Sequence, residues 1–389
     1  MCLMVANTAS MIAEFNLPNL TLLKSLGYQV QVACNFEQGN TCSAQKIERL
    51  KRQLNEMDIP FHQIDFPRSV NPLALIRAGG QLRKLLQAYA FDVIHTHTPL
   101  TSALVRMEAD GHSKIIYTAH GLHFFKGAPL HYWLVYYPIE RWLAKKTDVL
   151  ITINQEDFHR AKAHLKAKRV VYIPGIGVDV DAFSAHTIDK TAKRKELGLE
   201  EDDTVILSVG ELSKRKNHQV MIRALGQLNR PNLHYLIAGQ GQEEQRLLRL
   251  ACTLGVHLHL LGYREDVKDL YAIADVFCLP SKREGLGIAG IEAMAMGLPL
   301  LTSHVGGIQD YAIHGVTGYV CEKNCPRVYA QGIEALLLNE KPVCDSQDNK
   351  RIASQFDMKY AKTCMEIIYK TLYPKCGERN CDDPPHTNA

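Results

Sequence analysis

Apolar runs of strand length alternate with helix-like segments through the second half of this chain. The apolar runs lie at 205–210, 234–239, 256–262, 276–280, 299–303 and 318–321, and the segments with helical spacing at 218–228, 243–255, 267–274, 288–296 and 326–338. Continuous apolar strands separated by amphipathic helices predict a parallel sheet covered by helices on both faces. We therefore expect a doubly wound, Rossmann-like α/β domain here.

The first half repeats this alternation less regularly. Its expected strands are 2–7, 29–33, 61–64, 93–95, 114–119, 149–153 and 170–173, and its expected helices are 16–25, 44–56, 73–88, 101–109, 133–145 and 155–164. The same reasoning predicts a second Rossmann-like domain. In doubly wound domains ligands bind at the carboxyl ends of the strands, so we expect two such domains to face a shared cleft.

Proline and glycine at 174–177 mark the expected boundary between the two domains. We predict a first domain at 1–175 and a second at 176–350, with a mobile segment at 185–203. Helical spacing predicts a C-terminal helix at 351–373, which we expect to cross back to the first domain. The remainder, 374–389, is rich in polar residues and proline and is expected to be disordered.

Composition is that of a soluble, cytoplasmic protein. The chain is 46% hydrophobic and 22% charged, it has no apolar run long enough to cross a membrane, and it does not start with a secretory signal. Its 11 cysteines include no C-x-x-C pair, so neither a zinc site nor a redox motif is predicted. Apolar surroundings, as at Cys278, indicate reduced core thiols.

Charge is unevenly distributed. Residues 1–175 carry a net charge of +7 and the remainder −3, so the first half suits either an anionic partner such as a phospholipid surface or simply a solvated basic face. An aromatic cluster, Trp133, Tyr136, Tyr137 and Trp142, precedes Lys145 and Lys146; it fits a membrane interface or ordinary helix packing. No interleaved aromatic and basic stripe predicts nucleic-acid binding.

Two glutamates, Glu284 and Glu292, dominate the candidate chemistry. Small residues separate them, and a helix-like run follows. Eight helical residues rise about 12 Å, which is too far for the paired carboxylates of a retaining glycosidase. Glycines at a helix start expose N–H groups without intrahelical partners, a place for phosphate. The segment therefore predicts a site for a ligand that carries phosphates and a polyol.

Several segments together resemble the retaining, GT-B-fold glycosyltransferases of the large "group 1" family (family 4). Residues 282–320 resemble the family's region with two glutamates eight apart, and SVGELSKRKNHQVMIRAL from Ser208 resembles its phosphate-binding strand, loop and helix. Residues 174–183 resemble the interdomain segment, and 92–99 and 118–126 resemble loops of the first domain. The stretch 131–162 is similar to bacterial members that build capsular polysaccharide and exopolysaccharide. The resemblance extends to about Tyr373.

The resemblance implies roles for individual residues. Glu284 would contact hydroxyls of the donor sugar, and Glu292 would hold the nucleotide ribose. Lys216, with Arg215 as a second candidate, would neutralise the diphosphate, and His120 would lie near the anomeric carbon. The backbone N–H groups of the intervening loop, Gly285, Leu286, Gly287 and Ile288, would face the sugar and diphosphate.

The implied reaction moves a hexose-type sugar, with UDP as the expected base, to a lipid-linked or saccharide acceptor with retention, on the front face of the donor. No cofactor or metal is implied, and peripheral association with the inner face of the cell membrane is expected. The chain departs from the resemblance at Glu211, where many members carry Arg, at Asp310, where many carry Glu, and at Thr8-Ala9-Ser10, which replace a glycine-rich loop.

Three other functions are weighed against a glycosyltransferase. A nucleotide-sugar 2-epimerase of the same fold would act on the donor without an acceptor. A non-catalytic assembly subunit could keep the fold, although intact Glu284, Glu292, Lys216 and His120 argue against decay. An NAD-dependent oxidoreductase would need a G-x-G-x-x-G fingerprint after the first strand, which is absent.

Overall fold

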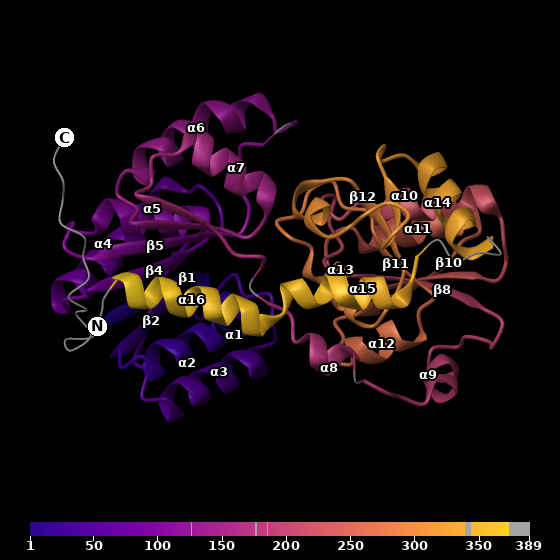
Figure 1. Cartoon of the computed structure of the whole chain (residues 1–389), viewed down its shortest axis with the longest axis horizontal. Coiled ribbons are helices and arrows are strands. Elements are labelled where there is room, and N and C mark those ends of the chain that lie inside the picture. Colours follow the sequence, from indigo (N-terminus) through magenta and orange to yellow (C-terminus); the bar gives the residue numbers. More distant parts are fainter. Residues whose placement is uncertain (126, 176, 185, 339–343, 373–389) are drawn as a thin grey trace. The chain divides into compact units, whose positions relative to one another are not determined.

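The computed structural model describes residues 1–389 except 126, 176, 185, 339–343 and 373–389. The chain forms two compact units, each built around one parallel sheet (Figure 1). The first comprises Met1–Thr152, Phe158–Ile173 and the chain from Ala361; the second comprises Ile153–Asp157 and Pro174–Tyr360. The second unit thus extends past the predicted limit of 350, and the predicted tail at 374–389 lies outside the described residues.

The first unit is a seven-stranded parallel sheet in the order β3-β2-β1-β4-β5-β6-β7. Its strands are β1 (Cys2–Thr8), β2 (Val30–Asn35), β3 (Phe61–Gln63), β4 (Val93–His97), β5 (Lys114–Ala119), β6 (Val149–Thr152) and β7 (Arg169–Tyr172). Its helices are α1 (Ala9–Phe15), α2 (Leu17–Ser25), α3 (Ala44–Glu56), α4 (Pro72–Ala88), α5 (Pro99–Glu108), α6 (Leu130–Ala144) and α7 (Gln155–His164). The strand order reverses between β1 and β4, which is the switch point where doubly wound sheets bind ligands.

The second unit repeats this plan with six strands in the order β10-β9-β8-β11-β12-β13. Its strands are β8 (Thr204–Val209), β9 (Leu233–Ala238), β10 (His257–Gly262), β11 (Val276–Leu279), β12 (Leu300–Ser303) and β13 (Gly318–Cys321). Its helices are α8 (Val180–Ser184), α9 (Lys190–Glu196), α10 (His218–Leu228), α11 (Glu244–Leu254), α12 (Val267–Ile273), α13 (Ile288–Ala295), α14 (Pro326–Leu338) and α15 (Ser346–Ala353), with short 3₁₀ turns at Gly306–Asp310 and Ser354–Phe356. Its switch point lies between β8 and β11.

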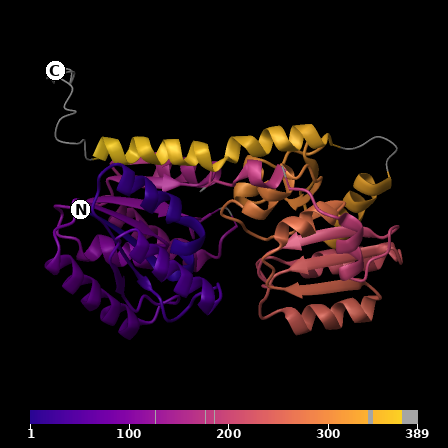
Figure 2. The ribbon, with the colours of Figure 1, turned by 90° about the horizontal axis from the view of Figure 1, so that it is seen from below.

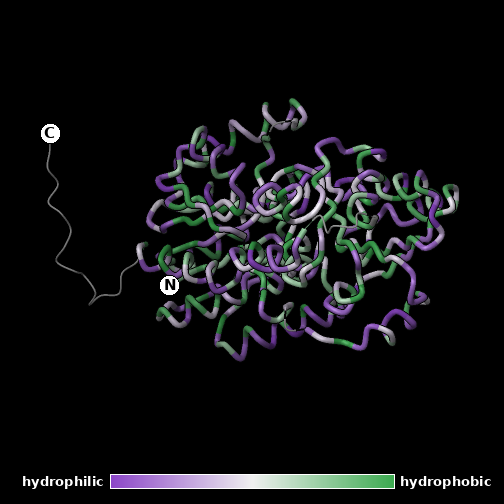
Figure 3. The backbone as a smooth tube through the Cα atoms, turned by 45° about the vertical axis from the view of Figure 1, so that its right-hand side comes forward, coloured by the Kyte–Doolittle hydropathy of each residue, from purple (hydrophilic) through white to green (hydrophobic). Residues whose placement is uncertain are grey.

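Apolar side chains on both faces of each sheet form the cores. Figure 3 shows hydrophobic and hydrophilic stretches alternating along the chain. In the first unit one face packs against α1, α2 and α3, and the other against α4 and α5. The last helix, α16 (Met358–Leu372), also packs into the first unit, where Ala361, Met365, Ile368 and Tyr369 are buried (Figure 2). The expectation that the C-terminal helix returns to the first domain is therefore confirmed.

Two short helices lie outside the segments that were predicted to be helical. Thr8-Ala9-Ser10, which replace the family's glycine-rich loop, span the end of β1 and the start of α1 at Ala9. The segment 185–203 contains α9, whose N-cap Asp189 accepts a hydrogen bond from the Ala192 N–H at 3.0 Å. No residue of α9 is buried, so this helix carries no apolar pattern that sequence periodicity could detect.

Candidate functional site

The two glutamates lie on consecutive parts of the second unit, at its switch point. Glu284 is in the loop that leaves β11, and Glu292 is in the second turn of α13. Lys216 and Arg215 lie in the loop between β8 and α10, and β8 is the strand that pairs with β11. The fold therefore brings together, at the carboxyl ends of β8 and β11, the residues that the sequence analysis predicted for donor binding.

Glu284 is buried and has three partners. Its Oε1 accepts hydrogen bonds from Lys216 Nζ at 2.7 Å and Ser281 Oγ at 2.6 Å, and its Oε2 lies 3.2 Å from Arg215 Nη1. The side chains of Glu284 and Lys216 are 7% and 12% exposed, against 46% for Arg215. Glu284 and Lys216 thus form an enclosed ion pair, while the side chain of Arg215 stays partly exposed.

Burial alone would raise the pKa of Glu284, but the charges of Lys216 and Arg215 and the hydrogen bonds from Lys216 and Ser281 outweigh it. The pKa therefore lies below its usual value. Glu284 is ionised at neutral pH, so its oxygens accept hydrogen bonds and do not donate them. This state suits contact with sugar hydroxyls and does not suit a general acid.

The loop after Glu284 turns its N–H groups away from the body of the unit. The carbonyls of Glu284, Gly285 and Gly287 accept hydrogen bonds from Gly307 N (3.3 Å), Asn154 Nδ2 (2.7 Å) and the Tyr311 hydroxyl (2.9 Å). In a trans peptide the C=O and N–H point in opposite directions. The N–H groups of Gly285, Leu286 and Ile288 consequently point outward, and among the described residues none of them has an acceptor.

Two glycines make this loop possible. Gly287, the N-cap of α13, has φ of +82°, a left-handed conformation that favours glycine. Gly307 packs so closely beneath the loop that a Cβ there would lie 2.2 Å from the Gly285 carbonyl oxygen. With the start of α13, which adds the positive end of the helix dipole, the loop provides a place for a diphosphate.

Glu292 is set apart from the ion pair, half-buried in α13. Its Oε2 accepts a 2.8 Å hydrogen bond from the Tyr271 hydroxyl. Burial raises the pKa of Glu292, although Tyr271 and the charge of Lys268 oppose the shift. Sequence reasoning missed four residues of the site: Asn154, Tyr271 and Ser281, which lie outside the segment 282–320, and Tyr311, which lies within it. Of these, Ser281 alone had a signal, as a polar residue directly after a predicted apolar strand.

Glu211, one of the departures expected from the family resemblance, does not touch the ion pair. Its side chain is 60% exposed, and its Oε2 lies 3.9 Å from Arg215 Nη2. Asp310, the shorter acid of the family position, accepts a hydrogen bond from the Gln155 N–H at 2.9 Å. Neither Glu211 nor Asp310 therefore takes the place of a group that contacts Glu284.

His120 follows β5 in the first unit and belongs to a row of three histidines. His97 Nδ1 lies 3.1 Å from His120 Nε2, and the His95 and His97 rings are 4.3 Å apart. His95 also bonds Thr118 Oγ1 and the hydroxyl of Tyr369 in α16, each at 2.8 Å. His95 and His97 thus share one face of β4, and His120 ends the row.

Burial lowers the pKa of all three histidines, to about 3 for His95 and about 4 for His120, and well below the usual value for His97. They are neutral at pH 7, so His120 can accept or donate one hydrogen bond without carrying charge. Among the described residues, no group of three or more His, Cys, Asp or Glu side chains could hold a metal ion.

Acid should destabilise the first unit through these histidines. Below about pH 6.5 the unfolded chain binds protons that the buried, neutral histidines do not. The free energy of unfolding should therefore fall with pH, by up to ~1.4 kcal/mol per pH unit for each histidine, down to about pH 4 for His120 and about pH 3 for His95. Denaturant titrations at several pH values measure this slope. His97→Asn should have a shallower slope, and equal slopes in both proteins would contradict the assignment.

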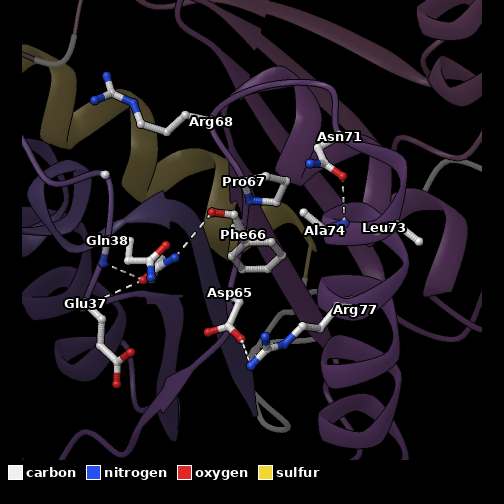
Figure 4. Close-up of a pocket in the computed structure, with 12 residues that line it drawn as sticks. Glu37, Gln38, Asp65, Phe66, Pro67, Arg68, Asn71, Leu73, Ala74 and Arg77 are labelled. Atoms are coloured by element: carbon white, nitrogen blue, oxygen red, sulfur yellow. Dashed lines mark hydrogen bonds and ion pairs between the residues drawn. The ribbon is translucent and has the colours of Figure 1, made fainter.

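A polar hollow of about 460 Å³ opens in the first unit, beside the ends of β2 and β3 (Figure 4). Its wall carries the Asp65–Arg77 ion pair, 2.8 Å long, and Arg68. The amides of Asn35, Gln38 and Asn71 also line it. Amides, carboxylates and guanidinium groups are the side chains that bind hydroxyls and phosphates. No motif in the sequence predicted this hollow.

Known protein families and solved structures match this chain in sequence and in fold. Residues 189–353 match the family described as Glycosyl transferases group 1, and residues 20–182 match Glycosyltransferase Family 4. HepE of Anabaena, solved with UDP and glucose, superposes with a TM-score of 0.77 at 19% identity over 95% of this chain and 100% of its own. Sucrose-phosphate synthase of Thermosynechococcus elongatus gives 0.76 at 18% identity over 96% and 99%. The two Rossmann-like domains therefore define a GT-B fold.

The relatives in sequence identify the family. The glycosyltransferase EpsD of Bacillus subtilis is 34% identical over 368 residues, 91% of this chain and 92% of its own length. The chain belongs to the glycosyltransferases of group 1 and family 4, as the resemblance predicted. A UDP-Gal:alpha-D-GlcNAc-diphosphoundecaprenol alpha-1,3-galactosyltransferase of Escherichia coli is 31% identical, over 66% of this chain and 69% of its own length. No helix in the described part of the chain is long and apolar enough to cross a membrane.

Proposed function

We propose that this glycosyltransferase moves a hexose from a UDP-sugar to a lipid-linked or saccharide acceptor, with retention, in the synthesis of a cell-surface polysaccharide. The observation that carries the proposal is the enclosed Lys216–Glu284 pair beside a loop of outward N–H groups. One part can hold sugar hydroxyls and the other can hold phosphates, so together they match a sugar nucleotide.

Each group has a task in this reaction. Breaking the bond between sugar and phosphate builds positive charge on the anomeric carbon and negative charge on the diphosphate. Lys216, Arg215 and the N–H groups of the loop Gly285–Ile288 stabilise the diphosphate, and such preorganised donors contribute most where water is excluded. Glu284 holds the sugar hydroxyls, and Glu292 holds the ribose.

His120 is the group we assign to the sugar from the first unit. As a neutral imidazole it can hydrogen-bond a hydroxyl near the anomeric carbon without adding charge where positive charge develops. The departing phosphate then helps to take the proton from the acceptor on the same face, so the configuration is retained. No metal or cofactor is needed for this chemistry.

Two relatives support the choice of donor and acceptor. HepE binds UDP and UDP-glucose, and the Escherichia coli enzyme is named for UDP-Gal and a diphosphoundecaprenol-linked acceptor. The polar hollow of the first unit offers arginines and amides that suit a sugar with an attached phosphate. A lipid-linked acceptor would place the enzyme in the cytoplasm, at the inner face of the membrane.

Replacing Glu292 with alanine tests the donor site. We expect UDP-sugar binding to weaken by about tenfold or more, because hydrogen bonds to a carboxylate contribute ~1.5–3 kcal/mol. A thermal-shift panel of UDP-, GDP- and ADP-sugars should first single out UDP, since a ligand at 100 times its dissociation constant stabilises by ~2.7 kcal/mol. Unchanged affinity in the Glu292→Ala protein would show that the ribose is held elsewhere.

A matched control is Glu334→Ala in α14, which removes a glutamate from another helix of the same unit and should leave donor binding intact. An assay with and without candidate acceptors separates transfer from epimerisation. Inversion of the donor sugar at C2 in the absence of any acceptor would show epimerase activity and would contradict the proposed transferase function.

A further inference from the structure

The outward face of α6 is apolar where a surface helix is normally polar. Leu130, Leu134, Val135, Ile139 and Trp142 are exposed by 73%, 67%, 51%, 46% and 53%. Most of these positions recur at intervals of three to five residues, so the side chains form one stripe along the helix, which we name the α6 stripe. α6 lies at the outer margin of the first unit (Figure 1). A contiguous exposed apolar patch of this kind marks an interaction surface.

Contacts on the opposite side of α6 fix this rotation of the helix. The carboxylate of Glu140 is buried and accepts two 3.0 Å hydrogen bonds from Arg106 of α5. Trp133 Nε1 donates to the Phe125 carbonyl at 3.2 Å, and the Tyr137 ring lies 5.3 Å from that of Phe124, edge to face. Turning the stripe inward would break the Arg106–Glu140 pair, so the apolar outer face is built into the fold.

Cations gather at the C-terminal end of the stripe. Arg141, Lys145 and Lys146 are exposed, and within the described residues none of them forms an ion pair with a carboxylate. Lys146 Nζ lies 5.5 Å from the centre of the Trp142 ring. The one acid between 130 and 146 is Glu140, which Arg106 neutralises. The surface is therefore apolar along its length and positive at one end.

We propose that the α6 stripe docks this enzyme on an anionic lipid bilayer. Aliphatic side chains can enter the acyl boundary, a tryptophan suits the interface, and lysine and arginine attract anionic head groups. Charge complementarity favours lipid over a second copy of the chain, because two identical stripes would bring like charges together. The net charge of +7 over residues 1–175 acts in the same direction.

This inference deepens the proposed function, since it supplies the surface on which a lipid-linked acceptor would be met. It also revises the aromatic cluster expected from the sequence. Trp133, Tyr136 and Tyr137 pack inward against the core of the first unit, and Trp142 alone of the four faces out. The membrane contact is thus mainly aliphatic.

Vesicle binding of the full chain, without donor or acceptor, tests the proposal. The chain has two tryptophans, so Trp133→Phe leaves Trp142 as the reporter. We expect its emission to shift to the blue with vesicles of phosphatidylcholine and phosphatidylglycerol, and much less with phosphatidylcholine alone. Leu134→Glu/Ile139→Glu should lower partitioning by at least ~10-fold. The control Ile313→Glu/Ile367→Glu adds the same charge at positions exposed by 47% and 53% outside the stripe and should bind normally.

Two outcomes would overturn the proposal: equal vesicle binding by the stripe variant and the control, or self-association that the stripe variant abolishes in a protein that ignores vesicles. Activity separates this proposal from the proposed function. The stripe variant should keep wild-type transfer to a short-chain, water-soluble acceptor and lose it with the same acceptor in vesicles. Vesicle binding with no transfer to any acceptor would contradict the transferase and leave the membrane surface standing.

Discussion

Replacing Lys216 with alanine is expected to lower kcat/KM for sugar transfer by about two to three orders of magnitude, the effect of losing one preorganised donor to a developing anion. Lys216 Nζ lies 2.7 Å from Glu284 Oε1 and its side chain is 12% exposed, so its charge is held in an enclosed position. Steady-state kinetics with the donor identified by thermal shift measures the loss. Lys216→Arg should retain more activity, because it keeps the charge.

The control for this variant is Lys193→Ala. Lys193 is also in the second unit, is 10% exposed and pairs with Asp266, so it is matched to Lys216 in burial and charge. It should reduce stability without a comparable loss in kcat/KM. If both variants lose activity equally, the effect of Lys216 is on folding and the assignment to the diphosphate is wrong.

The largest effect on stability is expected from Arg106→Ala. Arg106 and Glu140 are 1% and 9% exposed, and the guanidinium also lies 4.6 Å from the centre of the Tyr117 ring. Removing Arg106 leaves a buried carboxylate without a partner, which costs about 3–5 kcal/mol. Chemical denaturation followed by circular dichroism measures this change in the free energy of unfolding.

Two further proteins make that result specific. Arg83 makes a similar two-bond pair with Glu108, but it is 60% exposed, so Arg83→Ala should change stability little. Arg106→Met/Glu140→Leu should recover much of the loss, because apolar replacements of a buried ion pair are often tolerated. Equal losses for Arg83→Ala and Arg106→Ala would show that burial is not the cause.

Hydrophobic periodicity predicted most of the fold, because most helices bury one face. His218–Leu228 and Gly318–Cys321 were placed at the bounds that the structure has. The method failed at α1 and α9. α1 is seven residues long, with no acid in its first turn and no side-chain cap, and α9 is stabilised by its cap and by ion pairs such as Lys193–Asp266.

Residues of the candidate site could be predicted only where they stand close together in one short segment or match a family motif. Glu284, Glu292 and the glycines between them stand together in the sequence, and Lys216 was found by its resemblance to a family motif. Asn154 lies 131 positions from the Gly285 carbonyl that it holds, and Tyr271 lies 21 positions from Glu292. Such pairings follow from the strand order of the sheet, which no local pattern contains.

The place of α16 has a consequence for how the chain folds as it is made. Tyr369 closes the core of the first unit and bonds His95, yet it is translated roughly 200 residues after β7, some tens of seconds later at typical rates of ~5–20 residues per second. During that interval the nascent first unit has an open apolar face where α16 will pack. Until α16 emerges from the ribosome, this apolar face of the first unit is therefore accessible to chaperones. A chain that a stop codon ends before α16 should aggregate instead of forming a smaller folded enzyme.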